Sequence, residues 1–485
     1  MRWHRSFSVV GALALSSGGA FAATATPEGA RAILRDYAAY FSQGVVDKGI
    51  VSVEPRDDGY FVTWNLRKAL AAVDAPEDAF RIEDFTYVLT PGAGDSWTVK
   101  AEHFPRVAFE LPTDKGQAKG VFAFDGFHFD GVYDPQADEF LRSTGGAGNL
   151  TGAFHIVDGE QASDFKFSED GITLETRAKP AAGGAGVDVA RAQAFKSLTE
   201  TIVPPRQGGS EAPAEMTYTI GGVASGATLA GLRAKEIGDF WRYVVAHFGE
   251  PAAPPDLKPL LQAMLPLWDE IRADAKLGDL EFQTPFGTAR MKSIDESVDL
   301  SGFTAAGIAE IGVKVEDLSL ASALLPGWVS SLSPASLDLS LRLTGQDWDK
   351  AARIALDDPH FGETGDLAPE TGDEITQTLL GGHPKIVLAP GRLKIPALDL
   401  SFSGMADVEA GVPTAHFDVS ADSLDKTIAL LQDLVNVEPD AQGALLGVTM
   451  LKGLATVGAD GRLVWEIESN GDGVVVNGSP LATGP

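Results

Sequence analysis

The sequence predicts a β-rich α+β protein with large antiparallel sheets, a central helical insert, and two related or stacked β units. Alternating apolar and polar runs, bounded by turn residues, fill most of the chain after residue 49. Longer patterns with helical spacing are concentrated in one central block. The 485 residues are 44% hydrophobic and 22% charged, so the chain can bury substantial cores.

Residues 1–22 have the form of a signal peptide. Arg2 and Arg5 precede an apolar stretch from Phe7 to Leu15, and Ala20-Phe21-Ala22 makes a small-x-small cleavage site. The apolar stretch is about half of the ~20 residues needed to span a bilayer, although a buried helix is the alternative. We expect cleavage between Ala22 and Ala23, a periplasmic location, and no transmembrane segment in the mature protein.

Composition restricts the chemistry and the partners. The chain has no cysteine, which excludes disulfides, thiolate metal sites and cysteine nucleophiles. Removal of Arg2 and Arg5 with the leader leaves 36 basic against 68 acidic side chains, a net charge of −32. Such a charge repels nucleic acid and anionic head groups, so we expect no nucleic-acid partner.

Residues 23–203 are expected to form an N-terminal β-rich domain with a leading helix. Thr26-Pro27-Glu28 is a typical helix start, and Gly44 ends the pattern. The composition break at residues 178–186, which contains Lys-Pro-Ala-Ala-Gly-Gly-Ala-Gly, precedes a helix-like stretch at 187–202. Strands are expected at 49–54, 60–66, 81–89, 97–101, 105–111, 120–133, 151–157, 164–168 and 171–177.

Residues 204–279 are expected to form a linker and a helical hairpin. Two amphipathic patterns, from Leu229 to Phe248 and from Leu257 to Ile271, are separated by Pro251 to Pro255. Residues 280–485 then return to alternating strands, including one expected at 449–458, with short helices at 347–356 and 423–435. We interpret this last segment as a C-terminal β-rich domain.

Two segments of the C-terminal part share a strand-to-helix junction. Leu337 to Lys350 and His416 to Lys426 each alternate like a strand and end in Asp-Lys near the start of a helix. Ser420 to Lys426, the repeated hairpins and the terminal Val474 to Gly478 together make residues 280–485 resemble AsmA-like envelope proteins and uncharacterised secreted proteobacterial relatives. The resemblance implies envelope maintenance by an elongated, curved sheet whose inner face contacts lipid acyl chains. AsmA-like proteins usually keep a membrane anchor, whereas this leader looks cleavable.

No motif in the chain specifies a catalytic or metal site, so we expect no catalytic residue, no metal and no cofactor. Ser423-Leu424-Asp425-Lys426 fits Ser-x-x-Lys but lacks the Ser-x-Asn and Lys-Thr-Gly partners, which indicates a helix cap. The adjacent acids Asp138 and Glu139 are compatible with acid-base chemistry, but adjacency is uninformative among 68 acids. The seven histidines of the mature chain are at least 23 residues apart, so metal ligands would have to converge from distant strands.

An aromatic cluster is the candidate ligand-binding feature. Asp125-Gly126 lies between two alternating runs, and a two-residue turn there pairs Phe124 with Phe127 and Phe122 with Phe129. Four rings on one face are either core or the wall of an apolar groove. A turn at Asp130-Gly131 is the competing register.

These observations favour a non-enzymatic periplasmic envelope protein that binds a lipid or another apolar ligand along a curved β-sheet. A secreted hydrolase with a site built from distant Asp, Glu and His residues is the second hypothesis. A protein-interaction scaffold, recognisable by an exposed sheet edge or apolar patch, is the third.

Overall fold

The computed structural model confirms a β-rich α+β protein. It describes residues 25–73, 75–159, 161–205, 215–248, 257–361, 367–381, 383–409, 412–422, 424–438, 441–470 and 473–481. Ala22, Ala23 and Ser423, to which the sequence assigned cleavage and capping, lie outside these residues. The chain forms two compact units: residues 1–160, 170–192 and 231–267 make unit 1, and residues 161–169, 193–230 and 268–485 make unit 2.

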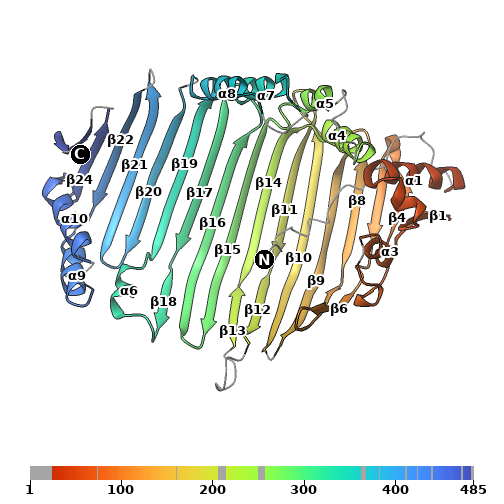
Figure 1. The fold of residues 1–485 in the computed structure, drawn as a ribbon, viewed down its shortest axis with the longest axis horizontal. Helices are drawn as coiled ribbons and strands as arrows, with labels where there is room; N and C mark the ends of the chain where they lie inside the picture. The colour runs from red at the N-terminus through yellow and green to blue at the C-terminus, as the bar shows by residue number, and fades with distance from the viewer. Residues whose placement is uncertain are drawn as a thin grey trace. The chain divides into compact units, whose positions relative to one another are not determined.

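Unit 1 combines an antiparallel sheet with a leading helix and the helical hairpin (Figure 1). Its helices are α1 (Pro27–Phe41), α2 (Gln43–Asp47), α3 (Leu66–Ala71), α4 (Ala234–Ala246) and α5 (Leu257–Met264), with 3-10 turns η1 (Glu77–Ala79) and η2 (Ala93–Asp95). Its strands are β1 (Val51–Arg56), β2 (Gly59–Trp64), β3 (Phe80–Ile82), β4 (Phe85–Pro91), β5 (Trp97–Ala101), β6 (Val107–Thr113), β7 (Gly116–Asp125), β8 (His128–Asp134) and β9 (Glu139–Asp158). The strands β10 (Gln161–Pro180), β11 (Val187–Phe195) and β14 (Gly222–Leu232) contribute residues to both units.

Helix α1 covers the sheet of unit 1 and closes its core. The Thr26 side chain accepts a hydrogen bond from Gly29 N at 3.1 Å, as the N-cap pattern predicts. Ile33 and Tyr37, four residues apart on one helix face, are fully buried against Val62 and Leu89 of the sheet. A side chain at Gly29 would collide with the Tyr60 hydroxyl, so glycine permits this close approach.

Unit 2 is a series of antiparallel strands with helices between some of them. Figure 1 shows its strands side by side. Besides β14 they are β12 (Ser197–Val203), β13 (Met216–Ile220), β15 (Glu270–Thr284), β16 (Gly287–Ser301), β17 (Gly307–Glu316), β18 (Ser319–Ser322), β19 (Ser336–Gln346), β20 (Lys385–Ile395), β21 (Leu398–Glu409), β22 (Val412–Ala421), β23 (Thr456–Val457), β24 (Leu463–Ser469), β25 (Val474–Val476) and β26 (Ser479–Leu481). The helices are α6 (Gly327–Leu332), α7 (Trp348–Asp357), α8 (Pro369–Gly381), α9 (Asp425–Val435) and α10 (Ala441–Leu454).

A small core lies at the C-terminal end of unit 2. Ala421, Leu424, Trp465 and Val476 are buried there, and α9 and α10 pack on the strands through their apolar sides. The Trp465 indole N–H donates to the Leu451 carbonyl at 2.7 Å, which fixes α10 on β24. Within the part of the chain that the structure describes, no helix is both long enough and apolar enough to cross a membrane.

Several predicted elements are wrong. Residues 187–202 form strands β11 and β12 rather than a helix. Val187 and Val189 alternate into a buried face, which overrides the helix propensity of the alanines that follow them. Residues 449–454 belong to α10 rather than to a strand. Helix α8 was not predicted. The helical hairpin α4–α5 is confirmed, but Leu229 and Ile271, at the outer ends of the predicted patterns, lie in β14 and β15. The two strand-to-helix junctions, β19 to α7 and β22 to α9, are confirmed.

Candidate functional site

The predicted hairpin that would place the four phenylalanines on one face is wrong. β7 and β8 do not pair with each other; both pair with the long strand β9. Phe122 faces Gly152 across the sheet, Phe124 faces Leu150, and Phe129 faces Gly145. The competing register is wrong too, because Asp130 and Gly131 lie inside β8.

Three of the four rings, Phe124, Phe127 and Phe129, belong to two overlapping groups of contacts. Phe124 and Phe127 contact each other with centroids 6.0 Å apart, and Phe104 contacts both. Phe127 and Phe129 pack against the buried core of unit 1. All four side chains are partly buried, and a role for Phe122, Phe124, Phe127 and Phe129 in ligand binding stays a prediction.

The adjacent acids Asp138 and Glu139 have separate, satisfied partners. The Tyr40 and Tyr133 hydroxyls both donate to the Asp138 carboxylate, and Arg242 of α4 lies 3.4 Å from it. Burial of the Tyr40 hydroxyl is the main reason why its pKa lies well above the ordinary value, and its hydrogen bond to the Asp138 carboxylate raises the pKa further. Glu139 pairs instead with Arg191 at 2.7 Å. This arrangement indicates a structural junction between α1, β8 and α4.

The strands of unit 2 carry an apolar face that is only partly covered. In the register of β15, β16, β17, β19 and β20, alternate residues share one side of the sheet. We call this side the open face. It consists of Ile271, Ala273, Ala275, Leu277, Ile294, Glu296, Val298, Leu300, Ala309, Ile311, Val313, Val315, Leu337, Leu339, Leu341, Leu343, Ile386, Leu388 and Leu393.

Large side chains at the centre of the open face are accessible to solvent. Ile311 is 58% exposed, Leu341 is 45% exposed and Ile386 is 51% exposed. Ile311 lies directly opposite Leu341, and Ile386 of the next strand lies opposite Leu343, diagonal to Leu341. The exposed groups are therefore contiguous across three strands, and Glu296 is the single charged side chain among the open-face positions.

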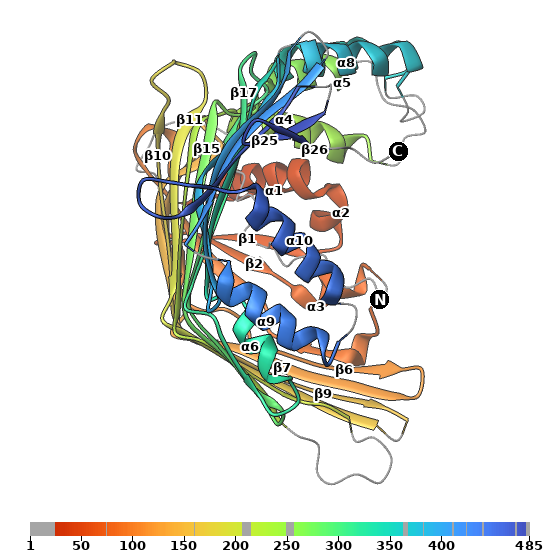
Figure 2. The ribbon, with the colours of Figure 1, turned by 90° about the vertical axis from the view of Figure 1, so that its left-hand side faces the viewer.

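Helices lie at the margins of the open face. Figure 2 shows α9 and α10 on the inner side of the bend of the unit 2 strands, where they pack on β21, β22 and β24. Trp348, which begins α7, lies against Gly307 at the end of β17. Figure 1 shows α7 and α8 at the same ends of the strands.

The opposite side of the same strands is charged, and we call it the charged face. Ion pairs join neighbouring strands there: Lys276–Asp295 at 3.4 Å, Arg272–Asp299 at 3.4 Å and Arg342–Glu310 at 3.7 Å. Hydrogen bonds from Lys314 and Lys292 lower the pKa of Glu316 to about 2. The sheet of unit 2 is thus two-faced, with apolar groups on one side and matched charges on the other.

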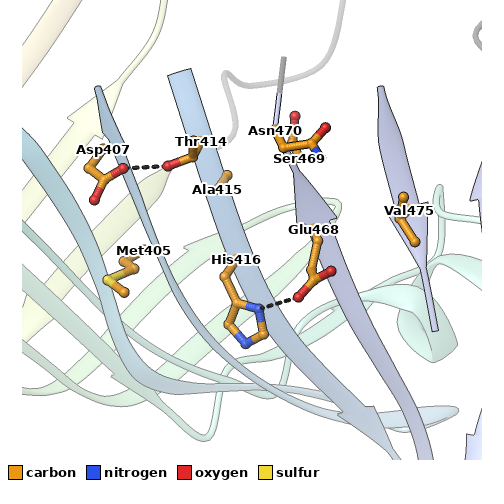
Figure 3. Close-up of a pocket in the computed structure, with 9 residues that line it drawn as sticks. All are labelled: Met405, Asp407, Thr414, Ala415, His416, Glu468, Ser469, Asn470 and Val475. Atoms are coloured by element: carbon orange, nitrogen blue, oxygen red, sulfur yellow. Dashed lines mark hydrogen bonds and ion pairs between the residues drawn. The ribbon is translucent and has the colours of Figure 1, made fainter. Parts of the chain in front are cut away.

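A hollow of about 290 Å³ opens on the charged side of the C-terminal strands. Figure 3 shows His416 of β22 and Glu468 of β24 pointing toward each other at its lower edge, and Asp407 and Thr414 are hydrogen bonded at its upper edge. Sequence reasoning missed this convergence. The signal was present, because His416-x-Asp418 and Glu466-x-Glu468 have the spacing that places side chains on one side of a strand.

Comparison with known proteins adds no relative from which a function could be transferred. No protein-family model, curated protein or solved structure matches the chain.

Proposed function

We propose that this chain is an exported, non-enzymatic envelope protein of the periplasm that binds a lipid or another apolar ligand along the open face of unit 2. The observation that supports this most directly is the contiguous exposure of Ile311, Leu341 and Ile386 on neighbouring strands. Contiguous apolar surface of this kind marks an interaction site more often than scattered apolar residues do.

The energetics favour an acyl chain as the ligand. Each methylene group removed from water contributes about 0.8 kcal/mol, so ten methylenes on the open face gain about 8 kcal/mol before the cost of ordering the chain. The strands run side by side, and open-face side chains from five of them offer an extended surface rather than a closed cavity.

The negative net charge of the chain favours some lipid head groups over others. The sequence carries a net charge of −30, which disfavours strongly anionic head groups at low ionic strength. We expect neutral or zwitterionic lipids, or protonated fatty acids, to bind better than polyanionic lipids.

The test combines two measurements on the purified full chain. Organic extraction followed by mass spectrometry identifies a co-purified lipid, and titration with a fluorescent fatty acid gives an affinity. We expect wild-type binding and a loss of at least tenfold in affinity in the triple variant Ile311→Ser, Leu341→Ser, Ile386→Ser.

The matched control changes the other side of the same strands. Glu310→Ser with Arg342→Ser removes an ion pair next to Ile311 and Leu341 and leaves the open face intact. Equal affinity in the triple variant and the wild type, or no uptake together with no co-purified lipid, would contradict the proposed function.

A further inference from the structure

The C-terminal end of the charged face departs from the pairing seen elsewhere on that side. Between β15 and β20 several of its carboxylates pair with lysine or arginine, as in Lys276–Asp295 and Arg342–Glu310. On β22 and β24, Asp418, Glu466 and Glu468 have no lysine or arginine ion pair among the described residues. The ion pairs that Asp418 and Glu468 do form are with His416. This end of the charged face therefore presents carboxylates that have no lysine or arginine partner among the described residues.

Strand register brings these groups together on one side of the sheet. His416 lies directly opposite Glu468, and Asp418 lies directly opposite Glu466. Val419 and Trp465, which alternate with them, face the core under α9 and α10, so the four polar side chains face away from that core. One ligand atom each from His416, Glu466 and Glu468 lies within 4.8 Å of the others.

The two nitrogens of the His416 imidazole have different surroundings. Nε2 lies 3.4 Å from the Asp418 carboxylate, and Nδ1 lies 3.8 Å from the Glu468 carboxylate. In metal sites, a ligating histidine commonly directs its other N–H to a carboxylate, which fixes the tautomer. With the proton on Nε2 toward Asp418, the Nδ1 lone pair is left to face Glu468, and Glu466 is within reach of a cation bound between them.

We infer that His416, Glu466 and Glu468 bind a divalent metal ion of the Zn²⁺ class, and that Asp418 orients the imidazole. One imidazole nitrogen with two carboxylates is a donor set that suits Zn²⁺ better than Ca²⁺ or Mg²⁺, which prefer oxygen ligands alone. The hollow beside Glu468 leaves space for water to complete the coordination. The site lies on the side opposite the open face, so it is independent of the proposed lipid function.

The experiment is isothermal titration calorimetry of the EDTA-treated full chain with ZnCl₂, and separately with CaCl₂, at neutral pH and 150 mM NaCl. We expect one Zn²⁺ site and weaker Ca²⁺ binding. His416→Ala removes the site, Glu468→Gln weakens it by at least tenfold, and Asp418→Asn weakens it by about 10–100-fold.

His103→Ala is the matched control, because His103 lies 3.2 Å from Glu83 and is an exposed histidine in an ion pair with one carboxylate. The control leaves the Zn²⁺ isotherm unchanged, and circular dichroism of each metal-free variant verifies its fold. The inference is overturned if the wild type binds no Zn²⁺, if His416→Ala has the wild-type isotherm, or if binding is a diffuse response that all variants share.

Discussion

The core of unit 1 and the open face of unit 2 use similar alternating sequences with opposite results. In unit 1, α1 covers the sheet, and Ile33, Val62 and Leu89 are each no more than 1% exposed. In unit 2, Ile311 and Leu341 occupy equivalent alternating positions but remain about half exposed. Alternation alone therefore determines which side of a strand is apolar, whereas a packed helix determines whether that side becomes a core.

The sheet of unit 2 has other sources of stability besides a core. Its long strands satisfy one another's backbone groups by continuous antiparallel pairing, as between β15 and β16. Cross-strand ion pairs line the charged face, although each exposed pair contributes at most about 1 kcal/mol. The open face is therefore not required for folding to the extent that the core of unit 1 is.

The largest expected effect comes from the core of unit 1. Leu89→Ala creates a cavity beneath α1 and is expected to lower the free energy of unfolding of that unit by about 2–5 kcal/mol. Leu341→Ala, the matched change on the open face, is expected to cost less than about 1 kcal/mol because the side chain is already half exposed. Urea unfolding followed by tryptophan fluorescence measures both, and equal losses would remove the distinction between the two regions.

A smaller effect is expected at the polar junction of unit 1. Asp138→Ala leaves the Tyr40 and Tyr133 hydroxyls and Arg242 without their shared acceptor. We expect a loss of about 1–3 kcal/mol in the free energy of unfolding. Asp239→Ala, which removes a more exposed partner of the same arginine, serves as the control. A similar loss in both variants would show that burial of Asp138 does not matter.

The smallest effect is expected on the charged face, and it depends on pH. The pKa of Glu316 is lowered from 4.5 to about 2, so its stabilising contribution is present above pH 4.5 and is lost as the pH falls toward 2. The difference in Tm between wild type and Glu316→Gln is therefore constant from pH 7 to pH 5 and closes at lower pH. A difference that closes between pH 7 and pH 5 would be inconsistent with this pKa.

Local signals in the sequence were sufficient for much of the fold. The N-cap pattern Thr26-Pro27-Glu28 predicted the start of α1, because a cap depends on neighbouring residues alone. The strand-to-helix junction at Asp347 was also predicted, and its side chain accepts a hydrogen bond from Lys350 N.

Local signals in the sequence could not predict which strands pair when they are far apart in the chain. Phe122 and Phe129 were assigned to one hairpin, but the 20-residue strand β9 pairs with both β7 and β8 and separates their rings. His416 and Glu468 are neighbours because β22 pairs with β24, with α9 and α10 inserted between them in the chain. The spacing of residues along one strand predicts which side of the sheet each residue occupies. It does not predict which other strand pairs with that strand.

Access of an apolar ligand to the open face is the central claim, and the cysteine-free chain permits a direct measurement of it. Leu341→Cys and Arg342→Cys place a single thiol on opposite sides of one strand, and each is labelled with an environment-sensitive fluorophore. Addition of a fatty acid or a zwitterionic lipid is predicted to shift the emission of the label at position 341 and to leave that at position 342 unchanged. Equal responses at both positions, or none at position 341, would contradict a ligand site on the open face.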